Sequence, residues 1–299
     1  MKIVVGTRGS KLALVQTNWV VDELKKANPG IEFEVKVIKT KGDLITHLPL
    51  HKIGDKGLFT KEIEQQLLDK EIDLAIHSMK DMPSVLPEGL KFANIPKRQD
   101  PRDVLVLKEG YNCIDDLPKG AKIGTGSKRR TYQLLKYRPD LEIIPIRGNI
   151  DTRIRKIEDE NLDGIVLAAA GLIRAGLEKH ISYFIPTDIM VPAPAQGALA
   201  IEIRENDSFI EDIVSHIKDE ITEIQVLAER GFLTGVNGSC HVPMGAYCEI
   251  NNDNLTLTGL YGDENGNKLV IKSLEGKLED ASKLGFELAD MVLKEYNNL

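Results

Sequence analysis

The sequence predicts an α/β protein with two units built on mainly parallel sheets, followed by a small α+β unit with a three-stranded antiparallel sheet. Three observations lead to this prediction. Buried-strand patterns alternate with helical patterns in the first third of the chain, the alternation restarts after the polar, proline-flanked stretch 97–101, and three short turn-linked strand patterns occupy the C-terminal part. A chain of 299 residues has room for two or three such domains.

In the first unit the elements follow the order strand, helix, strand, helix, strand. Ser10 is a suitable N-cap for the first helix. A glycine-containing loop over 40–57 has the length of either a lid or a disordered segment, and its Lys52 and Lys56 suit a lid over an anionic ligand. The expected strands cover 3–5, 31–37 and 72–76, and the expected helices cover 11–26 and 61–70.

The stretch 77–83 directly follows the last of these strands. A buried strand that breaks into a charged pair places Lys80 and Asp81 at the C-terminal edge of a sheet, where open α/β sheets hold ligands. A carboxylate fixed at such an edge can accept a proton or stabilise a cation. The alternative interpretation is a solvated turn before Pro83.

The second unit repeats the pattern without repeating the sequence. The segment 191–197, rich in Pro and Gly, looks like a crossing segment, after which a strand over 199–203 and a helix over 208–218 can return to the first sheet. In the second unit itself the expected strands cover 104–107, 122–124, 143–146 and 164–170, and the expected helices cover 128–137, 150–158 and 172–177.

The C-terminal part begins with a helix over 221–233 that has Ile221, Ile224, Leu227 and Ala228 on one face. Three strand patterns form an antiparallel meander, which the last helix covers. The strands are expected over 246–250, 255–260 and 268–274, and the helix over 280–296. We therefore expect domain 1 over 1–98 and 191–218, domain 2 over 99–190 and domain 3 over 219–299.

The charge distribution points to an anionic small ligand. A net charge of −7 argues against a general nucleic-acid binder, yet the segment 121–138 carries six Lys or Arg residues and no carboxylate. Six arginines, two of them in this segment, fall at strand ends or helix starts, where guanidinium forks and free helix N–H groups bind carboxylate or phosphate. The arginines in such positions are Arg8, Arg129, Arg130, Arg147, Arg153 and Arg174. For each one, the alternative is an ordinary surface side chain.

Other kinds of site are disfavoured. The segment 124–128 lacks the spacing of either nucleotide-binding glycine motif. The cysteines and His241 lack zinc spacing, so we expect no metal, and an odd number of cysteines without framework spacing predicts no disulfide. Cys240 lies in an accessible glycine-containing loop and is either a special thiol or a free surface one, whereas Cys248 fits a buried strand.

Composition also bears on localisation. The chain is 42% hydrophobic and 28% charged, values typical of a globular protein. The apolar run at residues 3–5 is too short for a signal peptide, and no later run is long enough to span a bilayer. We therefore expect a cytoplasmic protein.

Together, these motifs resemble the hydroxymethylbilane synthase family, also called the porphobilinogen deaminases, over essentially the whole chain. So many long matches in one order make the resemblance highly specific. The matching segments are GTRGSKLAL at 6–14, GDKGLF at 54–59, HSMKDMP at 77–83, RGN at 147–149 with Arg153, AGL at 170–172 with Arg174, and the loop around Cys240.

The resemblance implies a transferase of haem biosynthesis that joins four porphobilinogen molecules head to tail. Ammonia is released at each step, and the linear tetrapyrrole hydroxymethylbilane is finally hydrolysed off. The resemblance also implies a dipyrromethane cofactor, made from substrate and attached by a thioether to Cys240. The implied fold has two domains like type II periplasmic binding proteins and a third that carries the cysteine, and the implied state is a monomer.

Roles for individual residues follow from the same resemblance. Asp81 matches the catalytic carboxylate, which holds pyrrole N–H groups and stabilises the azafulvenium cation left when ammonia departs. The acetate and propionate on each pyrrole ring explain the arginines. The implied cofactor contacts are Cys240, Lys80, Asp81, Ser127, Arg129, Arg130 and Ser10; the implied substrate contacts are Arg8, Arg147, Arg153, Arg174 and Gln196; Lys52 and Lys56 match the mobile loop.

Three positions depart from the family pattern. Ser239 replaces the second glycine of a Gly-Gly-Cys, His241 replaces a common Gln, and Ala195 replaces a Gly before Gln196. A Cβ at position 239 or 195 restricts the backbone to negative φ or adds strain, so we expect local differences in loop geometry.

Two alternatives differ in class. A non-enzymatic solute-binding protein for a small polycarboxylate would explain the arginines, but it needs neither Cys240 nor a third domain and normally carries an export signal. A ligand-sensing regulator needs a DNA-binding helix-turn-helix, whereas this sequence begins with a strand pattern.

Overall fold

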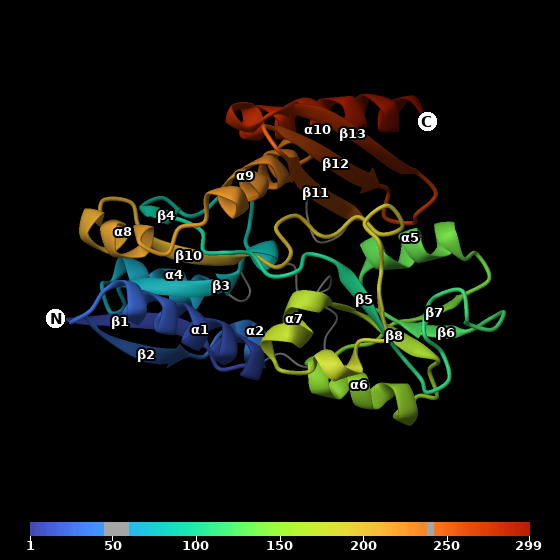
Figure 1. Cartoon of the computed structure of the whole chain (residues 1–299), viewed down its shortest axis with the longest axis horizontal. Coiled ribbons are helices and arrows are strands. Elements are labelled where there is room, and N and C mark those ends of the chain that lie inside the picture. Colours follow the sequence, from blue (N-terminus) through green and yellow to red (C-terminus); the bar gives the residue numbers. More distant parts are fainter. Residues whose placement is uncertain (45–59, 238–241) are drawn as a thin grey trace. The chain divides into compact units, whose positions relative to one another are not determined.

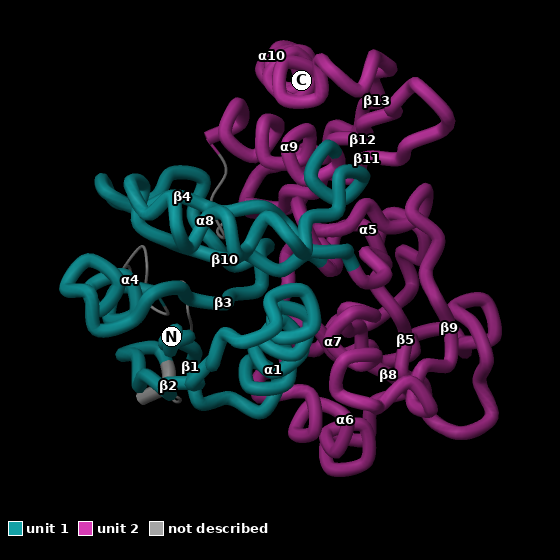
Figure 2. Tube along the Cα trace, turned by 60° about the vertical axis from the view of Figure 1, so that its left-hand side comes forward, with its two compact units in different colours: residues 1–98, 198–224 teal, residues 99–197, 225–299 magenta. Residues whose placement is uncertain are grey.

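The computed structural model describes residues 1–44, 60–237 and 242–299. These residues form two compact units, shown in Figure 2: Met1–Arg98 with Ala198–Ile224, and Gln99–Gly197 with Gln225–Leu299. The second unit contains both the expected domain 2 and most of the expected domain 3. The division into three domains therefore stays a prediction.

Unit 1 is built on a five-stranded mixed sheet with the order β2-β1-β3-β10-β4 (Figure 1). β1 is parallel to β2 and β3, whereas β10 is antiparallel to β3 and β4. The expected return of the chain to the first sheet is confirmed. Four of the five strands run in the same direction, as a mainly parallel sheet requires, and the returning strand β10 runs opposite to them. The strands are β1 Lys2–Arg8, β2 Glu32–Ile38, β3 Leu74–Ser78, β4 Leu90–Phe92 and β10 Leu199–Arg204; the helices are α1 Lys11–Ala27, α2 Lys41–Leu44, α4 Lys61–Leu68, α8 Ser208–Ser215 and the 3₁₀ turn η1 Met79–Asp81.

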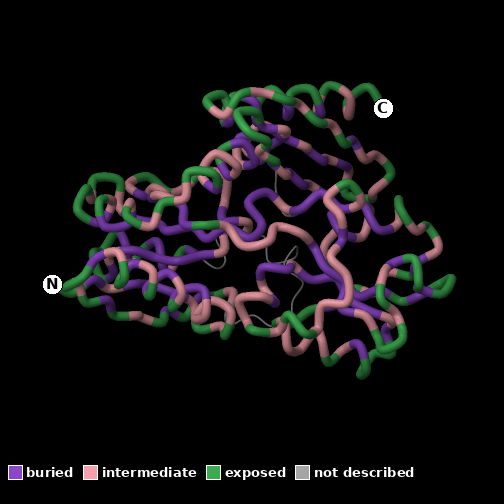
Figure 3. Tube along the Cα trace, in the orientation of Figure 1, coloured by how far each residue is buried: buried purple, intermediate pink, exposed green. Residues whose placement is uncertain are grey.

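The sheet of unit 1 is buried on both faces. On one face, Ile76 of β3 and Ile201 of β10 pack with α1 and α8 in one core cluster. On the other face, Ala75 of β3 packs with Ile63 and Leu67 of α4 in a second cluster. Strands covered on both faces are apolar at nearly every position, which is why they read as short apolar runs in the sequence. In Figure 3 the central strands β3 and β10 are coloured as buried, whereas the edge strand β2 is partly exposed.

Unit 2 contains a second five-stranded mixed sheet with the order β7-β6-β8-β5-β9. β6 is parallel to β7 and β8, and β5 is antiparallel to β8 and β9. Leu105 packs on the side of α5, and Val104 and Val106 pack on the side of α6. The strands are β5 Asp103–Leu107, β6 Lys122–Gly124, β7 Glu142–Ile144, β8 Gly164–Ala168 and β9 Tyr183–Phe184; the helices are α5 Lys128–Tyr137, α6 Ile150–Asp159, α7 Ala169–Arg174 and η2 Glu178–His180.

The C-terminal part contains the predicted antiparallel sheet, with the order β11-β12-β13. Helix α10 packs against this sheet, with Leu284 of α10 in contact with Gly276 of β13 (Figure 1). Helices α9 and α10 approach so closely that a Cβ at Gly285 would lie 2.4 Å from the carbonyl oxygen of Ala228. Glycine at this position makes the approach possible. The bounds are α9 Glu220–Gly235, β11 Met244–Asn251, β12 Asn254–Gly262, β13 Leu269–Lys277, η3 Leu278–Asp280 and α10 Ala281–Asn298.

One helix face differs from the sequence prediction. Ile221 and Leu227 of α9 are 59% and 49% exposed, whereas Glu229 and Phe232 are fully buried. The periodicity of apolar residues does not reveal the buried face of α9, because that face contains the carboxylate of Glu229. Within the described ranges, no helix is long and apolar enough to cross a bilayer.

Candidate active site

The predicted catalytic pair lies directly after a buried strand. β3 ends at Ser78, and the turn η1 follows, with Lys80 half-buried and Asp81 exposed. The turn is held by its backbone: Met79 N–H donates to the carbonyl of Ala198 at 3.1 Å, and the N–H of Met82 donates to that of Met79 at 3.1 Å. Ala198, the residue before the neighbouring strand β10, thus holds the start of the turn from which the Asp81 carboxylate projects.

The other site residues predicted in unit 1 lie at the same sheet edge. β1 extends to Arg8, further than expected, and Ser10 caps α1 by accepting a hydrogen bond from the N–H of Ala13 at 3.3 Å. β1 and β3 are parallel neighbours, so their C-terminal ends meet at one edge. In addition, the Ser78 hydroxyl donates to Gln16 Oε1 at 3.1 Å, which ties α1 to the end of β3. The structure thus brings Arg8, Ser10, Lys80 and Asp81 to one edge of one sheet.

In unit 2, three predicted residues converge on a carboxylate that sequence reasoning missed. Arg129 and Arg130 open α5 as predicted, after the N-cap Ser127, and their guanidinium groups are buried against Asp103. Arg129 Nη1 lies 2.6 Å from Asp103 Oδ2, and Arg130 Nη2 lies 2.7 Å from Asp103 Oδ1. Gln196 Nε2 donates to the same Oδ1 at 3.1 Å.

The loop that carries Gln196 is held from its other side by Glu229. Ala195 has a left-handed backbone with φ of 58°, and its N–H donates to Glu229 Oε2 at 2.6 Å. The other carboxylate oxygen of Glu229 accepts from the N–H of Cys248 in β11 at 2.9 Å. Ala195 thus adopts the left-handed conformation, which is costly for a residue with a Cβ, and its buried hydrogen bond to Glu229 offsets part of that cost.

Arg174 is placed differently from the prediction. The helix begins at Ala169, earlier than expected, so Arg174 is the last residue of α7 and not part of its first turn. The argument from a helix N-terminus therefore fails for this residue. Its Nη2 donates to the carbonyl of Gly197 at 2.8 Å, and burial lowers the pKa of Arg174 to about 10. A carboxylate bound here would offset that cost of burying the charge.

Arg147 and Arg153 belong to a more open region. Arg147 is exposed and lies three residues beyond the end of β7, not at the end of the strand as expected. Asn149 caps α6 by accepting from the N–H of Thr152 at 2.9 Å, and Arg153 Nε donates to the carbonyl of Gly148 at 2.7 Å. Both arginines thus flank the start of one helix, where anions are favoured.

Several predicted residues lie outside the described part of the chain. These are Cys240 with its neighbours Ser239 and His241, and the loop lysines Lys52 and Lys56. The prediction that Cys248 is a buried thiol is confirmed, since it is 0% exposed in β11.

Sequence reasoning missed Asp103, Glu229 and Gln16. All three are polar side chains at buried positions of a strand or helix. The available signal was a polar residue inside an apolar pattern, because buried polar groups are kept only where they have partners.

Two family models match the chain. The dipyromethane cofactor-binding domain of porphobilinogen deaminase matches residues 3–212, and the C-terminal domain of porphobilinogen deaminase matches residues 223–294. The chain belongs to the porphobilinogen deaminase family. Its activity is accordingly porphobilinogen deaminase activity in tetrapyrrole and haem biosynthesis, with porphobilinogen as substrate and a domain that binds the dipyrromethane cofactor.

Curated porphobilinogen deaminases align with the chain along its whole length. That of Clostridioides difficile is 68% identical over 298 residues, which cover 100% of this chain and 99% of the relative. That of Clostridium novyi is 61% identical, with 99% and 100% covered. That of Brevibacillus brevis is 51% identical, with 97% and 93% covered.

Solved structures of binding proteins are similar to part of the chain. The extracellular-binding protein of a probable amino-acid ABC transporter from Bacillus subtilis has a TM-score of 0.43 and 16% identity, covering 78% of this chain and 97% of that one. The L-cystine solute receptor of Neisseria gonorrhoeae has a TM-score of 0.41 and 14% identity, covering 77% and 90%.

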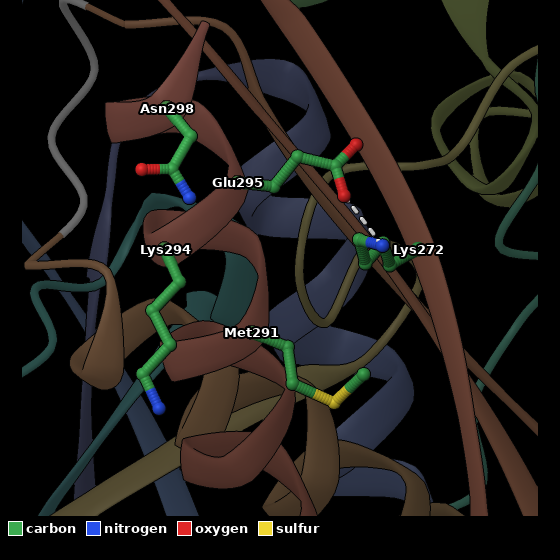
Figure 4. Close-up of a pocket in the computed structure, with 5 residues that line it drawn as sticks. All are labelled: Lys272, Met291, Lys294, Glu295 and Asn298. Carbon is green, nitrogen blue, oxygen red and sulfur yellow. Dashed lines mark ion pairs between the residues drawn. The ribbon is translucent and has the colours of Figure 1, made fainter.

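A surface hollow on the C-terminal helix does not involve the predicted site. It lies between α10 and β13, and in Figure 4 Glu295 pairs with Lys272 at 2.5 Å on one side of it. Met291, Lys294 and Asn298 also line it, and none of these residues was predicted to bind substrate. Among residues 1–44, 60–237 and 242–299, no group of three or more His, Cys, Asp or Glu side chains is placed to hold a metal ion.

Proposed function

We propose that Asp81 is the catalytic carboxylate of this porphobilinogen deaminase and that it stabilises the positive charge that develops on the pyrrole ring as ammonia leaves. The observation that carries this proposal is an exposed carboxylate on a fixed turn at the end of a buried strand, next to Lys80. Because the backbone of the turn is already hydrogen-bonded to Ala198 and within itself, the carboxylate meets the developing charge with little rearrangement.

The chemistry gives Asp81 a limited task. The C–N bond of the aminomethyl group breaks with both electrons leaving on the amine, which departs as ammonia once protonated. The positive charge that remains is shared by the methylene carbon and the ring nitrogen. A carboxylate that accepts a hydrogen bond from the pyrrole N–H stabilises this cation more than the neutral substrate. Such differential stabilisation lowers the barrier.

The donor set of the chain fits a dipyrromethane. Each pyrrole ring carries an acetate and a propionate, and a guanidinium fork binds a carboxylate at two points. When bound, the cofactor supplies the primer to which the first substrate is joined. We propose that Cys240 attaches the cofactor and that it is contacted by Ser10, Lys80, Ser127, Arg129 and Arg130. The carboxylates of the incoming substrate are bound by Arg8, Arg147, Arg153, Arg174 and Gln196. Lys52 and Lys56 act from the 40–57 loop.

Intact mass spectrometry tests the attachment. The purified protein should weigh more than its sequence by one dipyrromethane, and Cys240→Ser should lose that excess. Cys113→Ser, which alters a half-buried thiol elsewhere, should keep it. A wild-type mass equal to the bare chain, together with no consumption of porphobilinogen, would favour the alternative of a binding-only protein for a small polycarboxylate.

Steady-state kinetics test the role of Asp81. Asp81→Asn should keep the bound cofactor and the fold but reduce kcat by about 10²- to 10³-fold, because the removed charge acts mainly on the cationic state. Glu88→Gln, at an exposed carboxylate of the same unit, is the matched control and should leave kcat unchanged. A kcat near that of the wild type for Asp81→Asn would remove Asp81 from the mechanism.

We further propose that the enzyme is a cytoplasmic monomer whose three expected domains are 1–98 with 191–218, 99–190 and 219–299. The family resemblance and the globular composition support this proposal. Light scattering on a sizing column tests it, because a monomer should give the 33.2 kDa of the chain plus its cofactor.

A further inference from the structure

Asp103 is the centre of the buried cluster in unit 2. Its side chain is 0% exposed, and it is the first residue of β5, where it pairs with Ala168 of β8. On the other side of β5, its carbonyl accepts a hydrogen bond from the N–H of Ile185 at 2.9 Å. The carboxylate therefore projects from a backbone that is bonded on both sides, so its position is set by the sheet.

Three side chains from distant parts of the chain meet this carboxylate. Arg129 donates through Nη1 at 2.6 Å, Arg130 donates through Nε at 2.9 Å, and Gln196 donates through Nε2 at 3.1 Å. A charge-assisted bond to a fixed carboxylate restricts both the position and the plane of a guanidinium group. Asp103 thus orients two residues at the start of α5 and one in the 191–197 segment.

The two arginines are not held in the same way. Each nitrogen of Arg130 already donates a bond, since Nε and Nη2 reach Asp103 and Nη1 reaches the carbonyl of Val166 at 3.0 Å. Within the described part of the chain, the side-chain hydrogen bonds of Arg129 both come from Nη1, which reaches Asp103 and the carbonyl of Val191 at 2.7 Å. The Nε and Nη2 edge of Arg129 is thus the one oriented for another acceptor.

The net charge of the Asp103, Arg129 and Arg130 cluster also favours binding of an anion. One carboxylate charge faces two guanidinium charges, and both arginines are 6% exposed. Burial and the nearby Arg129 charge lower the pKa of Arg130, whereas Asp103 raises it. A ligand carboxylate would supply the second negative charge and relieve the repulsion between the two cations.

We propose that Asp103 is a positioning residue for cofactor and substrate binding: it fixes the Arg129 guanidinium, with Arg130 and Gln196, in the orientation that receives a pyrrole carboxylate. This inference rests on the proposed role of Arg129 and Arg130 as carboxylate binders. Asp103 itself is fully buried and acts through the arginines.

The test uses the full-length enzyme with Asp103→Asn, which keeps the size of the side chain and removes its charge. Asp140→Asn is the matched control, because Asp140 binds Arg138 at 2.7 Å beyond the other end of α5. We expect Asp103→Asn to lower the fraction of protein that carries the dipyrromethane at least threefold by intact mass. In the loaded fraction, KM for porphobilinogen should rise about tenfold with kcat changed less than threefold, and Asp140→Asn should match the wild type in all three readouts.

A purely structural role would change only thermal stability. If Asp103→Asn lowers the melting temperature but leaves cofactor occupancy and KM at wild-type values, the proposal is overturned. If the variant gives no folded protein, the same comparison is made in an Arg130→Gln background, where Asp103→Asn leaves one buried cation and the net charge of the cluster equals that of the wild type. Occupancy and KM equal to those of Arg130→Gln alone would likewise overturn the proposal.

A third variant separates this inference from the proposed function. Arg129→Leu removes the proposed carboxylate binder and should reduce occupancy or raise KM by itself. Normal behaviour of Arg129→Leu would contradict the proposed function of the arginines. Impaired Arg129→Leu with unimpaired Asp103→Asn would contradict only the role of Asp103.

Discussion

Asp81 and Asp103 are both aspartates at the end of a strand, but they differ in exposure and partners. Asp81 follows the C-terminal end of β3 and is exposed beside Lys80. Asp103 begins β5, is fully buried and binds two arginines. An exposed carboxylate can act on a charge that the substrate brings, whereas a buried one is already committed to the cations of its own chain.

The burial of a carboxylate, more than its neighbours in the sequence, therefore separates a chemical role from a positioning one. Each aspartate lies within one residue of a basic side chain, Lys80 or Arg102. In the sequence these pairs look alike. The predictions below test whether the two carboxylates behave as differently as their surroundings suggest.

The largest effects are expected for Asp81→Asn and Asp103→Asn, which should lose different properties. Asp81→Asn should lose most of its kcat with a melting temperature close to that of the wild type, because no buried partner is left behind. Asp103→Asn should lose about 3 kcal/mol of stability, since it leaves two buried cations without their anion. Thermal melts and kinetics on the same preparations check this, and equal losses of stability at both sites would break the comparison.

A smaller loss is expected at Glu229, whose two oxygens accept from the N–H groups of Ala195 and Cys248. Glu229→Gln keeps one acceptor and places an amide against the other N–H, which should cost about 1–3 kcal/mol. The melting temperature measures this loss. Glu223→Gln, at a half-buried carboxylate on the same helix, is the control and should lose less. No difference between the two variants would indicate that Glu229 does not anchor the loop.

A gain in stability is expected at Ala195. Its φ of 58° is costly for a residue with a Cβ, so Ala195→Gly should raise the stability by about 0.5–1 kcal/mol. Ala193→Gly, in the same loop, is the matched control and should give no gain. A lower melting temperature for Ala195→Gly would mean that the surroundings accommodate the methyl group without strain.

The smallest effect is expected at the partly exposed pair Arg138–Asp140. The Arg138 guanidinium lowers the pKa of the Asp140 carboxyl below its usual 3.8. The folded state therefore binds fewer protons than the unfolded state, and the stabilisation is present above pH 4 and lost as pH falls through the lowered pKa. Asp140→Asn should melt slightly below the wild type at pH 7, and the difference should shrink in acid. A difference independent of pH would exclude the ion pair as its cause.

Local signals predicted much of the fold. The N-cap Ser10, the buried strand that ends at Ser78 and the C-terminal meander follow from rules that act over a few residues. The direction of β10 did not follow from them, because an apolar strand pattern looks the same in either direction. The start of α7 was also missed, which placed Arg174 at the wrong end of its helix.

The candidate site was predicted only in part, because local signals do not connect residues that are far apart in the sequence. The cationic segment and the start of a helix predict Arg129 and Arg130 as ligand contacts, and the family resemblance predicts Gln196, but neither predicts the carboxylate that joins them. Asp103 is 26 residues from Arg129 and 93 residues from Gln196 in the sequence. No spacing rule connects positions that far apart, so only their place in the folded unit reveals the contact.

The sequence by itself determined the family, the element pattern and the residue types that the chemistry needs, because short motifs and periodicity are properties of neighbouring residues. The tertiary structure decided which charges are buried, which carboxylate is exposed and which partners each arginine has. These depend on how strands pair and helices pack, and the free energy of a charge depends on its surroundings far more than on its neighbours in the chain.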